Sequence, residues 1–481
     1  LEVARALVGA LAVLGAVCAA FAVLAPPPGA PAYAISTFTA AAAMGDEEAR
    51  RGAIGLAAVV RFGLTTLSSA GLGADVPIGA VQQVAVVVLA SLAMPIYAHA
   101  VHVVARAMSA AALADHPMRA AGCGLALTAA VGAAFALVEG WRLIDGLYFA
   151  VVLLTTVGYG EPDLVPATGA GLLILAAATL LATGVFSFAL AVVHRAVIGA
   201  EPPLSSLLVG LAGYAAVFAG GLWLLDGVPL GDGLYAAGIS VMTVGYGDVV
   251  PGSTASRVLV AVAVVPALGL MAAVNAAMSV VAARVIAWAA GKRYGVASIS
   301  HTELVMGVLV AAGGYVVFGG AVFALMQSGS GGGAFEGAAT PHSAPHALAI
   351  GCYWASVSLL TLGFGDVVPV SAAARLVTLG YLGCGLGLVE AALEHVRIIV
   401  VDSLGLDGGA SARQRWQAAY TSVAHRLESH RHPHAAAIRR AITAAKPRAA
   451  SPSPGNRRRP RSLAELVALW KRPRAGEAKL E

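Results

Sequence analysis

The chain has 481 residues, a formal net charge of +5 and a mean hydropathy of +0.82. It is 59% hydrophobic and only 11% charged, whereas a soluble domain has roughly 45–50% apolar and about 25% charged residues. This composition excludes a soluble globular protein and predicts a protein that crosses a membrane several times.

Apolar segments that are long enough to cross a bilayer occur eight times. About 20 apolar residues are needed for a helix to span the hydrocarbon core. In chain order, we expect spanning helices over 6–25, 79–104, 119–139, 168–194, 204–225, 255–288, 303–326 and 371–400. A shorter segment lies inside each successive pair, which predicts four units of helix, re-entrant loop and helix, because irregular backbone at membrane depth is tolerated where it lines a water-filled path.

The four short segments carry related motifs at regular spacing. They are S-A-G-L-G at 69–73, T-V-G-Y-G at 156–160, T-V-G-Y-G-D at 243–248 and T-L-G-F-G-D at 361–366. Ser69 and Thr156 are 87 residues apart, as are Thr156 and Thr243, and a fixed period marks an internal repeat. We expect four repeats and a basic tail, over 1–110, 111–200, 201–295, 296–402 and 403–481.

Two glycines separated by one residue occur in every one of these loops. Glycine accepts backbone conformations that other residues resist, so successive carbonyls can turn toward one axis. Carbonyl oxygens in a ring can replace the hydration shell of K⁺. Since such a ring needs four strands, the repeats predict one complete ring from a single chain.

The loops and their flanking helices resemble the potassium channels of the two-transmembrane, one-pore type, here fused four times over residues 1–402. The resemblance implies an all-α membrane protein whose repeats form a pseudo-tetramer around one central pore. It also implies that K⁺ is the permeant ion, that no cofactor is needed, and that the filter comprises Ser69, Ala70, Gly71, Leu72, Gly73, Thr156, Val157, Gly158, Tyr159, Gly160, Thr243, Val244, Gly245, Tyr246, Gly247, Thr361, Leu362, Gly363, Phe364 and Gly365.

Acidic and aromatic residues accompany three of the filters. The acids are Glu161, Asp248 and Asp366, which we expect to concentrate cations at the outer mouth and to bind the pore helices. By the resemblance, the aromatics that hold the pore helix against the filter are Tyr148, Tyr235 and Tyr353, eight residues before the filter threonine. We expect the hydroxyls of Tyr159 and Tyr246 to reach these aromatics.

The first repeat departs most from the family pattern. Arg61 stands at the aromatic position of its pore helix, and Leu72 replaces the filter tyrosine. These departures predict K⁺ selectivity that is looser than in a symmetric channel.

A proline follows each filter loop, and these filter prolines are Pro77, Pro166, Pro251 and Pro369. Special residues occur midway along the second helix of each repeat, 18 residues past its filter proline. They are Pro95, Gly184, Gly269 and Gly387. The resemblance implies a gating hinge, whereas close helix packing in lipid is the alternative. Near the end of the fourth such helix, we expect Glu390 and Glu394 to face an aqueous inner vestibule, since ionisable groups within spans usually do.

Basic residues concentrate in the links between repeats, including Arg106, Arg119 and Arg195. The positive-inside rule then places the links and both termini in the cytoplasm. Residues 403–481 hold 16 Lys and Arg against 5 Asp and Glu, so the tail is expected either to bind anionic lipid or to be simply solvated.

Several functions fit a four-repeat pore. A monomeric K⁺ channel is the first, and two glycines in every loop favour it over a four-repeat K⁺ uptake translocator, whose loops generally keep one. A weakly selective cation channel, a non-conducting scaffold and a dimer are further alternatives. The sequence contains no catalytic triad and no metal-ligand spacing, so neither an enzyme nor a nucleic-acid-binding protein is expected.

Overall fold

The computed structural model describes residues 8–12, 14–18, 56–73, 75–77, 80–108, 116–161, 163–197, 204–289, 301–330, 333–337 and 344–403. Within these residues, seven helices are long and apolar enough to cross a membrane. They are α3 (Ala80–Met108), α4 (Pro117–Glu139), the continuous run of α6 (Gly169–Ala177), η3 (Ala178–Ala182) and α7 (Thr183–Val197), α8 (Leu204–Asp226), α10 (Thr254–Ala289), α11 (His301–Gly329) and α13 (Ala372–Ser403). Seven predicted spans are thereby confirmed. Of the eighth, over 6–25, only residues 8–12 and 14–18 are described, and they are helical.

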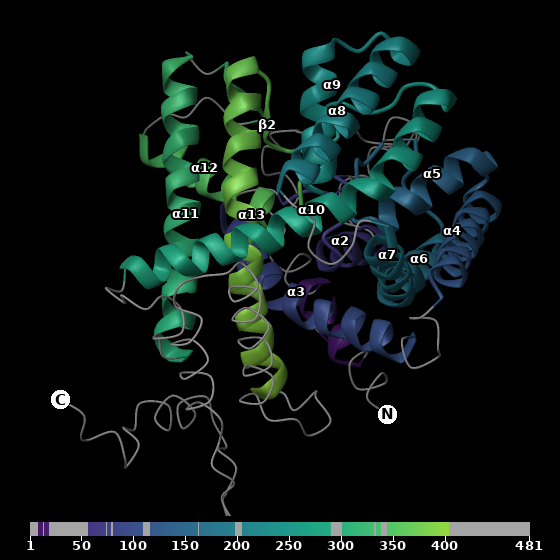
Figure 1. The fold of residues 1–481 in the computed structure, drawn as a ribbon, viewed down its shortest axis with the longest axis horizontal. Coiled ribbons are helices and arrows are strands. Elements are labelled where there is room, and N and C mark those ends of the chain that lie inside the picture. The colour runs from purple at the N-terminus through teal and green to yellow at the C-terminus, as the bar shows by residue number, and fades with distance from the viewer. Residues whose placement is uncertain are drawn as a thin grey trace, which may run out of the picture.

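A short helix stands before each filter loop. These pore helices are α2 (Leu56–Leu67), α5 (Leu143–Leu154), α9 (Leu230–Val241) and α12 (Ala344–Leu359). In Figure 1, α11 and α13 lie on the left, α8 and α9 at the top, and α4 to α7 on the right. The order of long, short and long helices therefore recurs through the described chain, as the sequence predicts. The exact repeat boundaries stay predictions.

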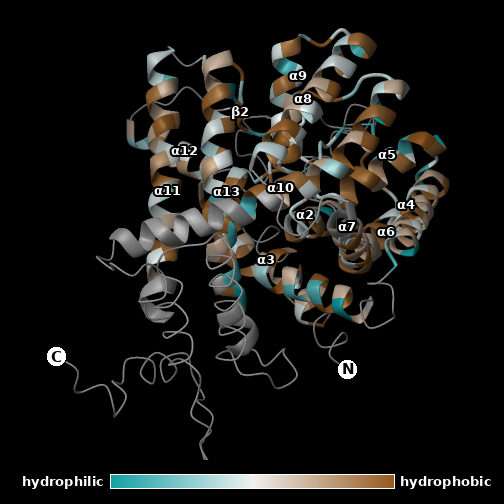
Figure 2. Cartoon of the chain, viewed as in Figure 1, coloured by the Kyte–Doolittle hydropathy of each residue, from teal (hydrophilic) through white to brown (hydrophobic). Residues whose placement is uncertain are grey.

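Burial separates the helices that precede a pore helix from those that follow one. For α4, α8 and α11, only 22–28% of the apolar window is buried inside the chain, against 44–50% for the four helices that follow a pore helix. Large apolar side chains are exposed on these three helices, among them Leu137 of α4, Val209 of α8 and Leu325 of α11, and Figure 2 shows hydrophobic residues throughout the helices. This is the surface that lipid requires, and it identifies α4, α8 and α11 as outer helices and the other four as inner helices.

Small residues let three of the pore helices approach the outer helix that precedes them. Gly146, Gly233 and Gly351 occupy one register of α5, α9 and α12. A Cβ on Gly351 would lie 2.6 Å from the carbonyl oxygen of Gly320 on α11, and a Cβ on Gly233 would lie 2.9 Å from Cα of Ala219 on α8. Close approach of this kind is how helices gain packing energy in lipid.

A short sheet braces the fourth repeat. β1 (Phe335–Glu336) pairs antiparallel with β2 (Val368–Pro369), with Phe335 opposite Pro369. Phe335 also packs edge-on against Trp354 of α12, with ring centroids 5.1 Å apart. Part of the segment between α11 and α12 therefore packs directly behind the pore helix and filter of this repeat.

Candidate functional site

The four filter loops begin with the same backbone geometry. Ser69, Thr156, Thr243 and Thr361 have positive φ values of 54–58°. In each loop the next N–H donates to the carbonyl five residues earlier, at 2.8–3.1 Å, which is the Schellman arrangement that ends many helices. Glycine is the usual residue at this left-handed position, and a β-branched residue there is an outlier. A side-chain hydroxyl is thus kept at all four positions despite its conformational cost.

The four loops close into one ring. A Cβ added to the first filter glycine of each loop would collide with a carbonyl oxygen of the preceding loop. The pairs are Gly71 with Leu362, Gly158 with Ala70, Gly245 with Val157, and Gly363 with Val244. The order of contacts runs through all four repeats and returns to the first, so the strands lie side by side around one axis.

The first loop differs from the others at its centre. Gly158, Gly245 and Gly363 have positive φ, and Gly71 does not. The second glycine, Gly73, has a φ of 65°, close to the 68–77° of its three counterparts. The first loop therefore has the same backbone conformation as the other three at Ser69 and at Gly73, and a different one at Gly71.

Hydroxyl pairs tie two filters to the next repeat. Tyr159 Oη lies 2.5 Å from Ser240 Oγ, and Tyr246 Oη lies 2.5 Å from Ser358 Oγ. Both serines stand three residues before a filter threonine, on α9 and α12. We expected these tyrosines to bond to the pore-helix aromatics that lie eight residues before each filter threonine. Their hydroxyls instead contact the next repeat, because the pore helix of that repeat places a serine beside each tyrosine.

Apolar contacts replace the hydroxyl pairs at the other two interfaces. Phe364 stacks on Phe62 of α2, with ring centroids 5.6 Å apart. Thr66, at the register of the two serines, is fully buried and its Oγ1 has no hydrogen-bond partner among the described residues. At the interface between the first and second repeats, Leu153 stands at this same register, three residues before Thr156. It lies with Leu72 in one buried apolar cluster. Hydroxyl pairs therefore join the second repeat to the third and the third to the fourth, whereas the two interfaces of the first repeat are apolar at this level.

The acids after the filters turn toward the pore helices. Tyr148 Oη donates to Glu161 Oε1, and Tyr353 Oη donates to Asp366 Oδ2 at 2.7 Å. Asp248 lies 3.9 Å from Arg375 Nη2. Burial raises the pKa of each of the three acids to about 6. The predicted bond to the pore helix is thus observed for two acids, and their burial sets them behind the filter.

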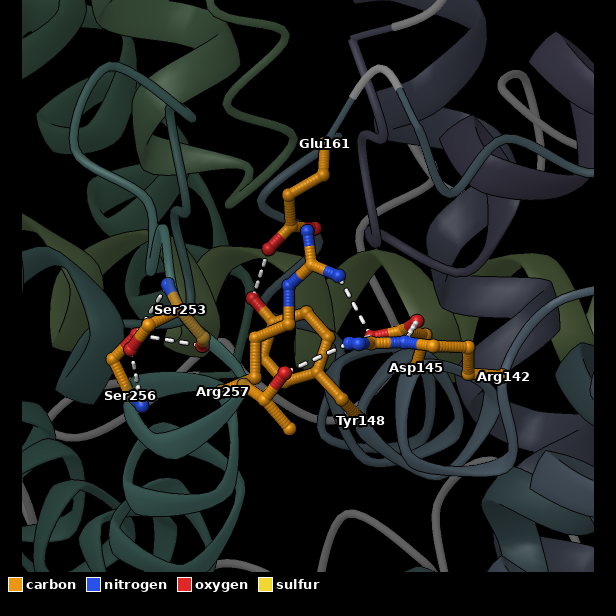
Figure 3. Close-up of polar contacts among 8 residues, drawn as sticks. Arg142, Asp145, Tyr148, Glu161, Ser253, Ser256 and Arg257 are labelled. Atoms are coloured by element: carbon orange, nitrogen blue, oxygen red, sulfur yellow. Dashed lines mark hydrogen bonds and ion pairs between the residues drawn. The ribbon is translucent and has the colours of Figure 1, made fainter.

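Guanidinium groups link neighbouring repeats beside these acids (Figure 3). Arg257 Nη1 donates to Asp145 Oδ1 at 2.7 Å, and its guanidinium lies 5.9 Å from the ring centre of Tyr148. Ser253 and Ser256 cap the start of α10 by reciprocal hydrogen bonds, immediately before Arg257.

The third and fourth repeats repeat this link. Arg375 Nη1 donates to Asp232 Oδ1 at 2.5 Å, with its guanidinium 4.9 Å from the ring centre of Tyr235. Sequence reasoning missed both links. The signal was present, because Arg257 and Arg375 each follow a filter proline by six residues, and Asp145 and Asp232 each precede a filter threonine by eleven.

The predicted hinge residues are buried midway along the inner helices. This holds for Pro95, Gly184, Gly269 and Gly387. A Cβ on Gly184 would lie 2.9 Å from Val104 of α3, so this glycine packs closely against the first repeat. Just before it, η3 forms a π-helical turn, and Tyr97 Oη donates to the Thr179 carbonyl at 2.7 Å. Such turns often occur at functional sites.

The predicted vestibule acids have partners nearby. Glu394 accepts from Nε of Arg397 on the same helix at 2.7 Å. Glu390 lies beside Asn275 of the neighbouring inner helix α10. Whether either acid faces an aqueous vestibule stays a prediction.

Comparison with known proteins identifies the family. A family model described as "Ion channel" matches residues 123–198, 207–284 and 311–402, together about half of the chain. The matches fall on the second, third and fourth repeats. Neither the curated proteins nor the solved structures contain a match to the chain. The chain therefore belongs to this ion channel family and carries its pore module in fused repeats, as the filter motifs predicted.

Proposed function

We propose that the protein is a K⁺-selective channel that conducts passively through the ring of four filter loops. The observation that carries this proposal is the closed order of contacts among the filter glycines and the neighbouring carbonyls. In this view one chain supplies all four strands, and the conducting unit is a monomer. The channel has no enzymatic activity.

The chemistry of the ring supports K⁺ as the permeant ion. The strands offer backbone carbonyls together with the hydroxyls of Ser69, Thr156, Thr243 and Thr361, which are neutral oxygen donors. Glu161 and Asp366 bond to pore-helix tyrosines behind the strands. A filter of carbonyl dipoles suits a dehydrated K⁺, whereas many less selective cation pores use rings of charged side chains.

A weakly selective cation channel is the second candidate. The observation that favours it is that only two of the four interfaces carry a hydroxyl pair, since Leu72 and Phe364 have no hydroxyl to donate. A ring tied on one side alone holds its carbonyls less firmly at the K⁺ distance.

The setting in the membrane follows from charge. The basic links lie in the cytoplasm and the filter mouth faces outward, with both termini inside. The basic tail, which lies outside the described residues, binds anionic lipid headgroups at the inner surface.

Reversal potentials in planar bilayers test the proposal. With K⁺ on one side and Na⁺ on the other, a K⁺ channel reverses near the K⁺ equilibrium potential. A reversal near zero supports the weakly selective channel instead. Absence of any current from protein that is shown to be inserted overturns both.

A further inference from the structure

The pore helix of the first repeat carries a largely buried arginine where the other repeats carry tyrosine. Arg61 occupies the register of Tyr148, Tyr235 and Tyr353. Its Nε and Nη2 donate to the two carboxylate oxygens of Asp75 at 2.8 and 3.1 Å. Its Nη1 donates to the Pro166 carbonyl at 3.0 Å. Only 14% of each side chain in the ion pair is exposed.

These three bonds join the outer ends of two filter strands. Asp75 follows Gly73, the last filter residue of the first repeat, by two positions. Pro166 is the filter proline of the second repeat, in the loop that continues from Gly160. One guanidinium therefore connects a pore helix, the end of its own filter and the end of the next.

The direction of the link is reversed relative to the interfaces between the second and third repeats and between the third and fourth. There, Arg257 and Arg375 begin the next repeat's inner helix and reach back over Tyr148 and Tyr235. The second repeat has no arginine at this position of its inner helix: six residues past Pro166 stands Leu172. The guanidinium at the interface between the first and second repeats thus comes from the pore helix, and its planar fork grips the carboxylate at two points.

Leu72 makes this link important for the first filter. A leucine cannot supply the hydroxyl bond that Tyr159 and Tyr246 make to the next repeat. Resting on the proposed function, we propose that Arg61 is a positioning residue that sets K⁺ over Na⁺ selectivity by holding the degenerate first strand and the second strand at the same radius. It acts through Asp75 and Pro166 and does not touch the permeant ion.

The test compares reversal potentials of Arg61→Leu, Arg61→Lys and a matched control. Loss of the guanidinium is expected to lower the K⁺/Na⁺ permeability ratio about tenfold, equivalent to about 1.4 kcal/mol. Lysine keeps the charge and loses the two-point grip and the third bond, so its ratio is expected between those of wild type and Arg61→Leu. A reversal potential does not depend on how many channels fold, so a purely structural loss of protein leaves it unchanged.

The matched control is Arg142→Leu. Arg142 binds Asp145 with the same two distances, 2.8 and 3.1 Å, and its side chain is 64% exposed. Arg142 Nη2 also donates to Thr254 Oγ1 of the third repeat at 2.8 Å, and this contact lies at the exposed surface. Asp145 keeps Arg257 as a partner when Arg142 is lost. The control is therefore expected to keep the wild-type ratio.

The outcomes separate the two proposals. A K⁺-selective wild type with an equally selective Arg61→Leu overturns the role of Arg61 and leaves the channel proposal standing. If Arg61→Leu does not reach the membrane, Arg61→Lys decides, and a full wild-type ratio in that variant overturns the role. A wild type without K⁺ selectivity contradicts the proposed function itself.

Discussion

Tyr159 of the second filter and Ser240 of the third pore helix meet at 2.5 Å between their hydroxyl oxygens. The pair shows the direction in which the repeats contact one another around the ring: the filter of one repeat packs against the pore helix of the repeat that follows. Tyr246 and Ser358 repeat the contact one step onward. The fourth filter then leans on the first repeat, through Phe364 and Phe62.

Restoring the missing hydroxyl at the last interface is expected to stabilise the protein. Thr66 stands where Ser240 and Ser358 stand, and its buried Oγ1 has no partner among the described residues. Phe364→Tyr should supply one, raising the stability by about 1 kcal/mol, measured as a higher Tm in detergent. In the Thr66→Val background the same substitution should give no gain. An equal gain in both backgrounds would show that the hydroxyl finds another partner.

Adding a methyl group to a filter glycine is expected to abolish K⁺ current. Gly158→Ala and Gly245→Ala each place Cβ on a carbonyl oxygen of the neighbouring strand, at a φ that disfavours alanine. Bilayer currents with quantified insertion provide the measurement. Gly213→Ala, in α8 with no heavy atom within 4 Å of the new Cβ, is the control. Selective K⁺ current in both filter variants would refute the filter assignment.

External acidification is expected to reduce the K⁺ conductance. Since burial raises the pKa of Glu161, Asp248 and Asp366 to about 6, these carboxylates gain protons between about pH 7.5 and about pH 5, above the ordinary carboxyl range. Protonation removes negative charge that attracts cations and weakens the bonds from Tyr148 and Tyr353. Single-channel conductance should fall with a midpoint near pH 6. A midpoint near the ordinary value of about 4 would place these groups in free solvent.

Removing the Tyr97 hydroxyl is expected to weaken the contact between the first two inner helices. Tyr97→Phe leaves the Thr179 carbonyl at the π-helical turn without its donor, at a cost of about 1–3 kcal/mol. The Tm should fall, whereas the K⁺/Na⁺ permeability ratio should stay at its wild-type value, because neither residue belongs to the filter. A changed ratio with an unchanged Tm would link this turn to the filter instead.

The sequence predicted the spans and the loops because each depends on local properties. A spanning helix follows from the length of an apolar run, and the filter follows from glycine spacing within a few residues. The hydrogen bonds between repeats were not predicted. Ser240 and Ser358 can be recognised as partners of the filter tyrosines only when it is known which repeat lies beside which around the ring. The links from Arg257 and Arg375 were visible in the register and were overlooked. The π-helical turn has no evident sequence signal.

A mixing experiment tests most directly whether one chain forms a whole ring. Wild-type chains are combined with Gly245→Ala chains in defined ratios, and K⁺ current is measured at constant total protein. A self-contained ring predicts a current that falls in direct proportion to the wild-type fraction. A much steeper fall would show that several chains share one pore and would contradict the account.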